Sequence, residues 1–538
     1  MLFNLKPNDS ICIDAAAAEL RVSVATVRNW IKTGYLEKDK KNSISIDSFE
    51  KFKKNVIGAE KLNKRANKSV KDSHNHSAVE KYINTILDEE CIDIEEVGSI
   101  YERKLSESYK NIEGIFYTPA NIVNEFFKHL PADRSEIIFC DPCCGTGNFL
   151  VAAARYGFKQ ENIYGFDIDG IAVKIARKRL AVYFNKNLSN IFQENIFDKN
   201  ISDNFDVVFT NPPWGKKISR EEKKKLSLKF KCENINDTSE LFFYLCLNIL
   251  KKNGALGLLL QDAFFNVSVF ENARKKALSY KIRSIIDFGK PFCGLVTKAK
   301  GMILEKNAVD EKNIVCCFAK NESHLRVQHS FTKNSKSILN TSCTEEDNEV
   351  LKHLFNIKHI TLKGNAHYGI GIVTGNNKKY CSGEAREGYI PAYKGSDITK
   401  NGLKEPSTFI PNNFSLYQQV APLDFYFSNE KLIYKFISSE LVFFHDTEQR
   451  IILNSANMLI LDKKFPITHK QLCDLLNSKI MSWIFFKLFE TNKVLRSDIE
   501  YLPIFTDYFY AYSDFEESFF LEYLNIKDID NGTYTIKK

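Results

Sequence analysis

The chain has 538 residues, 44% of them apolar, and a formal net charge of +8. This length predicts about three or four domains, each with an apolar core. The longest apolar run, residues 241–250, ends at two lysines and is too short to cross a membrane, and the first ten residues lack the basic flank and apolar core of a signal peptide. Thirteen cysteines without paired spacing are typical of a reducing compartment, so we expect a cytoplasmic protein without membrane contact.

Positive charge is concentrated near the N-terminus. Residues 1–71 hold fifteen Lys and Arg against eight Asp and Glu, a net charge of +7, so the other 467 residues together carry +1. Clustered basic residues favour a polyanionic partner for this part of the chain. A solvated lysine-rich segment would explain the charge equally well, so composition leaves both interpretations open.

Residues 1–57 have the pattern of a small helical module. The stretch 13–37 predicts two short helices joined by a tight turn, and 43–54 predicts a wing strand and a closing helix. The pattern resembles the winged helix-turn-helix of MerR-like and excisionase-like DNA-binding modules, in which the second helix enters the major groove. The alternative is a helical module that binds another protein. The resemblance implies that four residues contact DNA: Ser23, Thr26, Arg28 and Asn29.

Residues 58–110 predict a polar linker followed by a helical connector. The lysine-rich part, 58–80, has no apolar period, and its two histidines lack neighbouring ligands, so no metal site is expected. From 81 onward a helical apolar period returns and predicts packing on the next domain. The Tyr-Glu-Arg-Lys stretch at 101–104 contains an acid-x-Lys pair of the kind found in nucleases, but in a helical setting it indicates a solvated helix.

Between 137 and 305, short apolar runs alternate with amphipathic helices. This rhythm predicts an α/β fold with a doubly wound, Rossmann-like parallel sheet, whose ligands bind at the carboxyl ends of the strands. The predicted strands are 136–141, 162–169, 206–211, 254–261, 284–289 and 299–305. We expect this domain to span 111–306, with a connector at 307–365 and a mixed α+β domain at 366–538.

The stretch 139–153 lies at a predicted strand-to-helix junction. Gly145 and Gly147 allow a tight turn close to a ligand, and Asp141 ends the strand with an acid that can hold an amino group. The Lys-Ser/Thr pair of a phosphate-binding loop and the GxGxxG pattern are both missing, so the ligand is not chiefly a phosphate. The adjacent Cys143 and Cys144 indicate small packing residues rather than metal ligands.

Two further strand ends complete a site shaped for a nucleoside. Asp167 ends the second strand, where an acid can accept hydrogen bonds from ribose hydroxyls, and Asn195 follows the next strand, where an amide can pair with an adenine edge. One acid for an amine and one for a ribose, with no phosphate site, match S-adenosylmethionine. At Asp167 the alternative is an ordinary carboxylate at a strand end.

Residues 205–215 end a β-branched apolar run in Asn211, Pro212, Pro213 and Trp214. Because proline cannot donate to a sheet ladder, the strand stops there. A simple turn would explain the prolines. A site that grips a planar, nitrogen-bearing group would also explain the amide and the aromatic ring.

In order, these motifs resemble the DNA adenine-N6 methyltransferases of the γ order, whose cofactor motif precedes Asn-Pro-Pro-aromatic and whose target-recognition domain ends the chain. The resemblance implies that Asn211 and Pro212 accept the two N–H bonds of the adenine amine. It also implies that Trp214 stacks on an adenine flipped out of the duplex and that Phe292 flanks it. Asn195 stands where this family commonly has an acid. The implied cofactor contacts are Thr118, Asp141, Cys143, Gly145, Gly147, Asp167, Ile168 and Asn195.

The resemblance therefore implies methyl transfer from S-adenosylmethionine to the N6 amine of adenine in double-stranded DNA. It places the enzyme in a restriction-modification or related defence system, with cleavage left to a separately encoded endonuclease. Methylation of N4 of cytosine is the first alternative, because its chemistry is nearly the same. Methylation of protein or RNA, and a DNA-binding regulator with a decayed core, are the others.

Overall fold

The computed structural model describes residues 10–20, 24–32, 36–37, 43–55, 75–88, 94–105, 117–128, 130, 134–186, 190–215, 218–232, 235, 237–292, 297–319, 322–530 and 532–537. The chain divides into two compact units. The sheet unit comprises residues 63–342, and the second unit combines 1–62 with 343–538. Each unit is described by itself.

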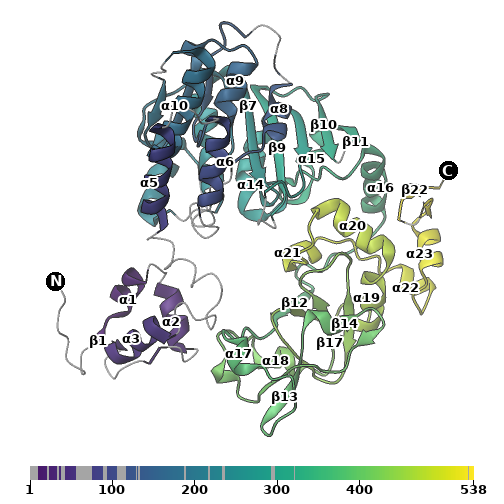
Figure 1. The fold of residues 1–538 in the computed structure, drawn as a ribbon. Coiled ribbons are helices and arrows are strands. Elements are labelled where there is room, and N and C mark those ends of the chain that lie inside the picture. The colour runs from purple at the N-terminus through teal and green to yellow at the C-terminus, as the bar shows by residue number, and fades with distance from the viewer. Residues whose placement is uncertain are drawn as a thin grey trace. The chain divides into compact units, whose positions relative to one another are not determined.

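The sheet unit is built on a sheet of nine strands among the described residues (Figure 1), in the order β11-β10-β8-β9-β7-β6-β3-β4-β5. From β5 to β7 all neighbouring strands run parallel. This confirms the predicted α/β class and places the carboxyl ends of β3 to β6 at one edge. The strands are β3 (Phe139–Asp141), β4 (Ile163–Asp167), β5 (Ile191–Gln193), β6 (Phe205–Thr210), β7 (Leu250–Gln261), β8 (Tyr280–Asp287), β9 (Ala299–Ala308), β10 (Ile314–Ala319) and β11 (Glu322–Val327).

The sheet differs from the predicted one in two respects. First, β9 is antiparallel to both of its neighbours, so the sheet is mixed rather than wholly parallel. The connection from β8 to β9 is too short for a helical crossover, so the chain returns antiparallel. Second, β10 and β11 extend the sheet past residue 306, so the predicted boundary there falls inside the sheet. The apolar run of β10 is a strand signal that the prediction missed, whereas β11 is mostly polar and largely exposed.

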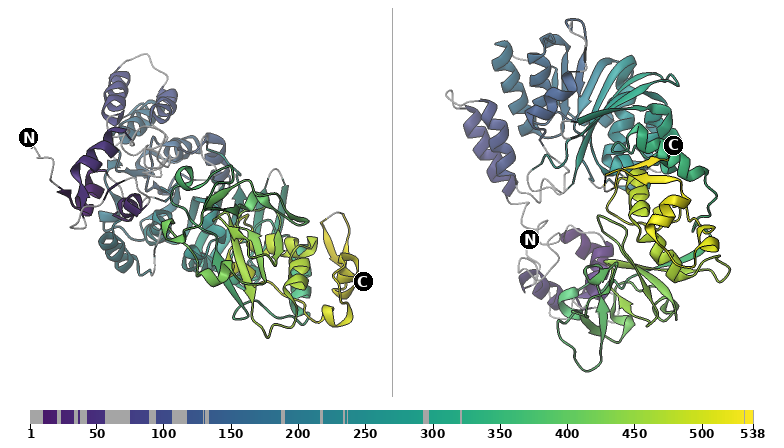
Figure 2. Two further views of the ribbon diagram at one scale, coloured as in Figure 1. Left: turned by 90° about the horizontal axis from the view of Figure 1, so that it is seen from below. Right: turned by 90° about the vertical axis from the view of Figure 1, so that its right-hand side faces the viewer.

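Helices cover both faces of the sheet (Figures 1 and 2). On one face α8 (Ala120–Phe127) and α9 (Asn148–Arg155) share an apolar core with the strands, together with part of α10 (Gly170–Phe184). On the other, α12 (Thr238–Ile249) and α14 (Glu271–Leu278) form a second core. The remaining α-helices among the described residues of this unit are α5 (Asn75–Asp88), α6 (Ile94–Lys104), α11 (Arg220–Phe230), α13 (Ala263–Asn266) and α15 (Gln328–Thr332).

The connector helices α5 and α6 belong to the sheet unit. Their apolar residues, among them Ile83, Val97 and Tyr101, pack against Ile171 and Ile175 of α10. The apolar face predicted from residue 81 onward therefore packs on the sheet unit, and α6 lies against α10, the helix that follows β4.

The C-terminal part of the second unit is mixed α+β. Its four-stranded sheet has the order β12-β20-β17-β18, and a three-stranded sheet has the order β16-β13-β19. These strands are β12 (Ala366–Ile370), β13 (Tyr389–Tyr393), β16 (Phe409–Pro411), β17 (Lys431–Lys435), β18 (Phe443–Asp446), β19 (Ile451–Ile452) and β20 (Ala456–Leu461). Its longer helices are α16 (Glu345–Asn356), α19 (His469–Leu476), α20 (Lys479–Phe489) and α23 (Glu517–Tyr523).

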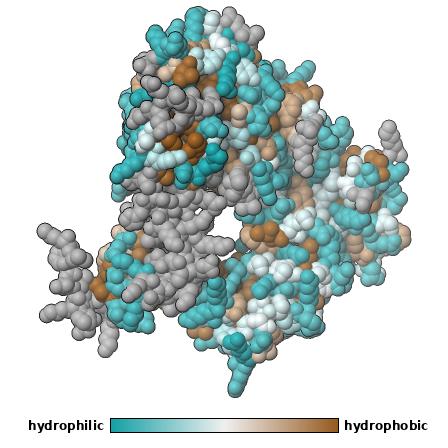
Figure 3. Space-filling view, in the orientation of Figure 1, coloured by the Kyte–Doolittle hydropathy of each residue, from teal (hydrophilic) through white to brown (hydrophobic). Residues whose placement is uncertain are grey.

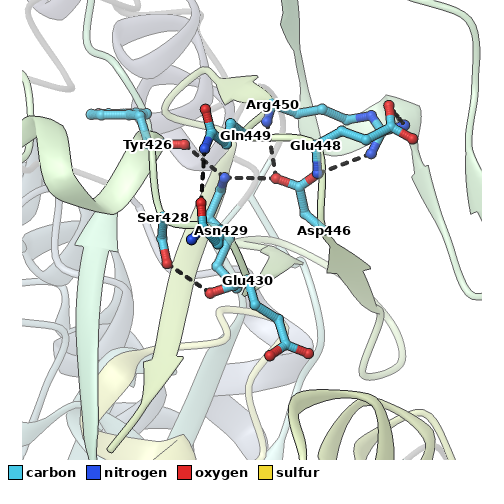
Figure 4. A network of polar contacts seen from close by, with 9 residues as sticks. Tyr426, Ser428, Asn429, Glu430, Asp446, Glu448, Gln449 and Arg450 are labelled. Atoms are coloured by element: carbon cyan, nitrogen blue, oxygen red, sulfur yellow. Dashed lines mark hydrogen bonds and ion pairs between the residues drawn. The ribbon is translucent and has the colours of Figure 1, made fainter. Parts of the chain in front are cut away.

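A buried ion pair joins β17 to β18 (Figure 4). Lys431 and Asp446, both without solvent exposure, face each other across the two strands with an Nζ–Oδ2 distance of 2.6 Å. Lys431 also donates to the carbonyl of Tyr426 and Arg450 donates to Asp446, at 2.8 and 2.9 Å. Burial raises the pKa of Asp446, but the hydrogen bonds from Lys431 and Arg450 outweigh it, so the net shift is downward. Since an unpaired buried charge is costly, the pair fixes the register at this end of the hairpin.

The N-terminal module contains the predicted helices, strand and closing helix: α1 (Ile13–Glu19), α2 (Val24–Lys32), β2 (Ile44–Ser45) and α3 (Ile46–Asn55). A further strand, β1 (Ser10–Ile11), pairs antiparallel with β2. Trp30 and Phe52, with ring centroids 4.9 Å apart, lie in its small core. On α2, Arg28 is exposed and Thr26 is half-buried. Ser23 and the side chain of Asn29 lie outside the described residues.

In the part of the chain that the structure describes, no helix has the length and apolar character needed to span a bilayer. On the face drawn in Figure 3, hydrophilic residues are interspersed with smaller apolar patches.

Candidate active site

The loop between β3 and α9 makes a tight left-handed turn that needs glycine. Gly145 and Gly147 have φ angles of 51° and 88°. A Cβ atom at 147 would lie 3.0 Å from the Cβ of Ala176, and one at 145 would lie 3.2 Å from the ring of Tyr117. Both conformation and space therefore exclude a side chain at these positions. Gly147 is the N-cap residue of α9, so the loop leads directly into that helix.

Asp141 lies at the end of β3 and is 1% exposed. Its Oδ1 accepts hydrogen bonds from the backbone N–H of Cys143 at 3.1 Å and from the Thr210 hydroxyl at 2.6 Å. Burial raises the pKa of this carboxyl to about 7, although both hydrogen bonds oppose the rise. A carboxylate held here is short of compensating positive charge, so a cationic ligand group would stabilise it.

Asp167 lies at the end of the neighbouring strand β4. It accepts hydrogen bonds from the backbone N–H groups of Gly145, at 2.8 Å, and Asp169, at 2.9 Å. Burial raises its pKa to about 6. The carboxylate therefore ties the glycine loop to the next strand and presents a second acid at the same edge of the sheet.

A cavity of about 210 Å³ opens at this edge, beyond the carboxyl ends of β3 to β6. It brings together residues that are far apart in the sequence, as expected for this fold. The predicted site residues among its lining are Thr118, Asp141, Cys143, Gly145, Asp167, Ile168, Asn195, Asn211 and Pro213. Of the predicted catalytic, cofactor-contacting and base-flanking residues, those absent from the described lining are Gly147, Pro212, Trp214 and Phe292.

Several lining residues were not predicted from the sequence. Tyr117 stands beside the predicted Thr118 and could have been found from that motif, whereas Phe242 lies in α12, whose apolar character indicated only a core helix. Asp169, two residues after Asp167, and Phe197, two after Asn195, also line the cavity. Asn195 caps a short turn: its side-chain oxygen accepts the N–H of Phe197 at 3.2 Å.

The loop after β6 is joined to the glycine loop through Cys143. The thiol lies 2.9 Å from the Thr210 hydroxyl and donates to the Asn211 carbonyl at 3.3 Å. The Thr210 hydroxyl in turn donates to Asp141. Because burial raises the pKa of Cys143 well above its ordinary value, the group stays a thiol and can donate. Cys143 was predicted both as a packing residue and as a cofactor contact; here it also links the two loops.

Trp214, the last residue of the Asn-Pro-Pro-Trp stretch in this loop, packs against Phe292. Their ring centroids are 5.4 Å apart with an interplanar angle of 76°, and each residue is 7% exposed. The Trp214 indole N–H donates to the Leu259 carbonyl at 3.3 Å. The structure therefore brings the two predicted base-flanking rings together, in edge-to-face contact with each other.

Comparison with known proteins agrees with this geometry. A model of the N-6 DNA methylase family matches residues 92–366, about half of the chain, and a model of the TaqI-like C-terminal specificity domain matches residues 390–504. The first match contains the whole sheet, the glycine loop and the Asn-Pro-Pro-Trp loop. The second lies within the mixed α+β part of the second unit.

Individual relatives of this chain are also named as methyltransferases or methylases. The type II methyltransferase M.VspI of Vibrio sp. (strain 343) is 51% identical over 403 residues, which cover 74% of this chain and 99% of that protein. The modification methylase CviBIII of Paramecium bursaria Chlorella virus NC1A is 25% identical over 217 residues, 39% of this chain and 55% of its own.

A protein named as an N5-glutamine methyltransferase of Methanocaldococcus jannaschii is 36% identical, but over 118 residues that make up 21% of this chain and 57% of its own. Among solved structures, that of the DrdV–DNA complex superposes with a TM-score of 0.52 over 93% of this chain and 70% of its own, at 11% identity, which shows a shared fold.

The family model and the similarity to M.VspI show the family of this chain. The chain belongs to the N-6 DNA methylase family, the S-adenosylmethionine-dependent enzymes that methylate adenine in DNA, and it carries a TaqI-like specificity domain.

Proposed function

We propose that this enzyme methylates the N6 amine of an adenine flipped out of double-stranded DNA, and that the cavity at the edge of the sheet is where it does so. One observation carries the proposal: Asp141, Asp167 and the Asn-Pro-Pro loop border the same cavity, and Asp141 is joined to that loop through Thr210 and Cys143. A cofactor held by the acids would therefore lie next to the amine acceptors.

The residues around the cavity fit S-adenosylmethionine, which supplies the methyl group when bound. The positive charge of this ligand would stabilise the buried Asp141 carboxylate. The Asp167 carboxylate offers acceptor oxygens to the ribose hydroxyls. Gly145 leaves the loop free of side chains where a ligand approaches. Ile168, 59% exposed on the cavity wall, gives a flat ring an apolar surface, and Asn195 lines the same cavity.

The Asn-Pro-Pro loop supplies acceptors for the adenine amine, whose lone pair is delocalised into the ring. The Asn211 side-chain oxygen and the Pro212 carbonyl would each accept one N–H. Neither Pro212 nor Pro213 has an N–H of its own, and proline fixes the backbone direction at both positions. Two fixed acceptors draw the nitrogen toward tetrahedral geometry and aim it, so the loop acts by positioning and electrostatics.

Cofactor affinity should depend on pH through Asp141 and Asp167. Since protonation of Asp141, with a pKa of about 7, and of Asp167, with a pKa of about 6, removes the charges that hold the ligand, affinity should fall as the pH drops through these values. Calorimetry should show a loss of about ten-fold or more between pH 8 and pH 6. Asp167→Asn should weaken binding and flatten the lower step, whereas Asp198→Asn, at an exposed acid on the same edge, should leave the curve unchanged. A flat wild-type curve would contradict this assignment.

The product identifies the reaction. DNA treated with the enzyme and methyl-labelled cofactor should yield labelled N6-methyladenine on digestion to nucleosides and mass spectrometry. Label in N4-methylcytosine would instead support the cytosine alternative. Label that appeared in protein or RNA alone would overturn the proposed substrate.

We propose that the N-terminal module is a winged helix-turn-helix that adds DNA affinity without taking part in the chemistry. Its support is the helical pair α1–α2, the strand pairing that follows it, and the net charge of +7 in residues 1–71. On this reading Ser23, Thr26, Arg28 and Asn29 face the major groove.

Deleting residues 1–75 should weaken DNA binding and make it less salt-dependent. Each lost phosphate contact lowers the slope of log affinity against log salt by about 0.9. Arg28→Ala, at an exposed position on α2, should reproduce part of the loss; Lys51→Ala, at an exposed lysine on α3 paired with Asp47, is the charge-matched control and should not. Methylation at saturating DNA should keep its rate and target sequence. A deletion that abolished it would show that the module belongs to the catalytic machinery.

We further propose that the chain is the modification half of a cytoplasmic restriction-modification pair, with cleavage by a separately encoded endonuclease. The relative that covers most of the chain, M.VspI, is named as a type II methyltransferase. DNA from cells that express the chain should resist the nuclease encoded beside its gene. DNA cut by the purified chain itself would contradict this arrangement.

A further inference from the structure

The Tyr-Glu-Arg-Lys stretch of α6 is only partly the solvated helix that its sequence predicts. Arg103 and Lys104 are exposed, but Tyr101 is 1% exposed and lies in the core shared with α10. Its hydroxyl donates to Oδ2 of Asp169 at 2.6 Å. The short distance and the half-buried acceptor indicate a strong, charge-assisted hydrogen bond.

Asp169 is a junction between this tyrosine and the cofactor site. Its Oδ1 caps α10 by accepting the N–H groups of Ile171 and Ala172 at 2.9 and 3.2 Å. Its own N–H donates to Asp167 at 2.9 Å. Oδ2 accepts the hydrogen bond from the Tyr101 hydroxyl. Hydrogen bonds to α6, to the first turn of α10 and to Asp167 therefore hold Asp169 in place. An unbroken chain of hydrogen bonds thus runs from Tyr101 through Asp169 to Asp167.

A second contact from α6 reaches the glycine loop. A Cβ atom at Gly98 would lie 3.2 Å from the hydroxyl of Thr146, so the helix approaches that residue closely because position 98 has no side chain. Tyr101 also meets Tyr117 edge-on, with ring centroids 6.3 Å apart, and Tyr117 lines the cavity. Helix α6 therefore touches the segments before β3, after β3 and after β4 that form one side of the cavity.

We infer that Tyr101 is a positioning residue of the S-adenosylmethionine site, an inference that rests on the proposed role of Asp167. By holding Asp169, it fixes the first turn of α10 and the backbone N–H that orients the Asp167 carboxylate. Without the hydroxyl, Oδ2 of this half-buried carboxylate loses its donor and must rotate or recruit water. The Asp167 side chain then samples more conformations in the free enzyme, and fixing it on binding costs more entropy, so cofactor affinity falls. The geometry of the Asn-Pro-Pro loop does not change.

The test is Tyr101→Phe in the full-length protein, which removes the hydroxyl and keeps the packed ring. The dissociation constant of S-adenosylmethionine, measured by calorimetry, should rise about ten-fold, in line with the loss of a hydrogen bond to a charged acceptor. Turnover at saturating cofactor should stay within about two-fold of wild type. Tyr183→Phe is the matched control: its hydroxyl, on α10, donates to the Ala154 carbonyl at 3.1 Å, and cofactor affinity should be unchanged.

A double-mutant cycle separates positioning from general loosening of the fold. Asp169→Asn keeps an N-cap acceptor but lowers its charge, so the loss in Tyr101→Phe should be smaller in the Asp169→Asn background. Fully additive losses, unchanged affinity in Tyr101→Phe, or an equal fall in affinity in Tyr183→Phe would each overturn the inference. If the wild-type chain bound no S-adenosylmethionine, the proposed function would fail first, and the two failures would be told apart.

Discussion

Replacing Asn211 by alanine should lower turnover about 10²–10³-fold, the loss expected when a preorganised polar group is removed from a transition state. The side chain is half-buried at the cavity, directly after β6. Its oxygen is needed most when the adenine nitrogen leaves planarity, so the loss should fall on turnover. Because the acids proposed to hold the cofactor lie on β3 and β4, the calorimetric affinity for S-adenosylmethionine should stay within about two-fold.

Asn248→Ala provides a matched control for this variant. Asn248 lies on α12 of the same unit, is exposed, and donates to the Ile201 carbonyl away from the cavity. Its loss should leave both turnover and binding unchanged. Single-turnover methylation of a DNA duplex, followed by nucleoside analysis, measures the effect. A fully active Asn211→Ala enzyme would mean that the Asn-Pro-Pro-Trp stretch is only a turn.

The polar site could be predicted because its residues stand at strand ends. Asp141, Asp167 and Asn211 each follow a short apolar run, and parallel strands bring such ends to one edge of a sheet whatever their separation in sequence. Strand periodicity, two glycines and two prolines were sufficient signals. The sequence was sufficient to name these residues as candidates, and the structure adds the distances between them and their hydrogen-bond partners.

Contacts between segments far apart in the chain left no such signal. The bond from Tyr101 to Asp169 joins residues 68 positions apart, and a helical apolar period at 101–104 does not distinguish a packed tyrosine from a bonded one. The same holds for the place of β10 and β11 in the sheet, which depends on the pairing of β10 with β8 and of β11 with β10. Local pattern predicts elements and their ends; it does not predict which side chain meets which across the core.

The contact between Trp214 and Phe292 adds a free-energy cost to the stacking of a flipped base on Trp214. A flipped adenine that stacks on the Trp214 face in contact with Phe292 has to displace that ring, whose centroid lies 5.4 Å from the centroid of Trp214. Separating an edge-to-face aromatic pair costs about 0.5–1.5 kcal/mol. Stacking a base on an aromatic side chain contributes about 1–3 kcal/mol per base. The exchange is therefore favourable on balance, and more so if both rings contact the base.

Trp214→Ala should consequently have two large effects. Removing a buried aromatic ring from this core should destabilise the sheet unit by about 3–5 kcal/mol, measured as a fall in the denaturation midpoint. It should also abolish most of the fluorescence rise of 2-aminopurine placed at the target base, because no stacking face remains.

Trp214→Phe distinguishes these effects from a general loss of structure. It keeps an aromatic face but leaves the Leu259 carbonyl without its indole donor, at a cost of about 1–3 kcal/mol. Base capture should therefore survive in Trp214→Phe although stability falls. If capture failed in both variants to the same extent, Trp214 would act by supporting the loop. If capture survived in Trp214→Ala, the base would be held by Phe292 and the Asn211 acceptors without a stacking partner at position 214.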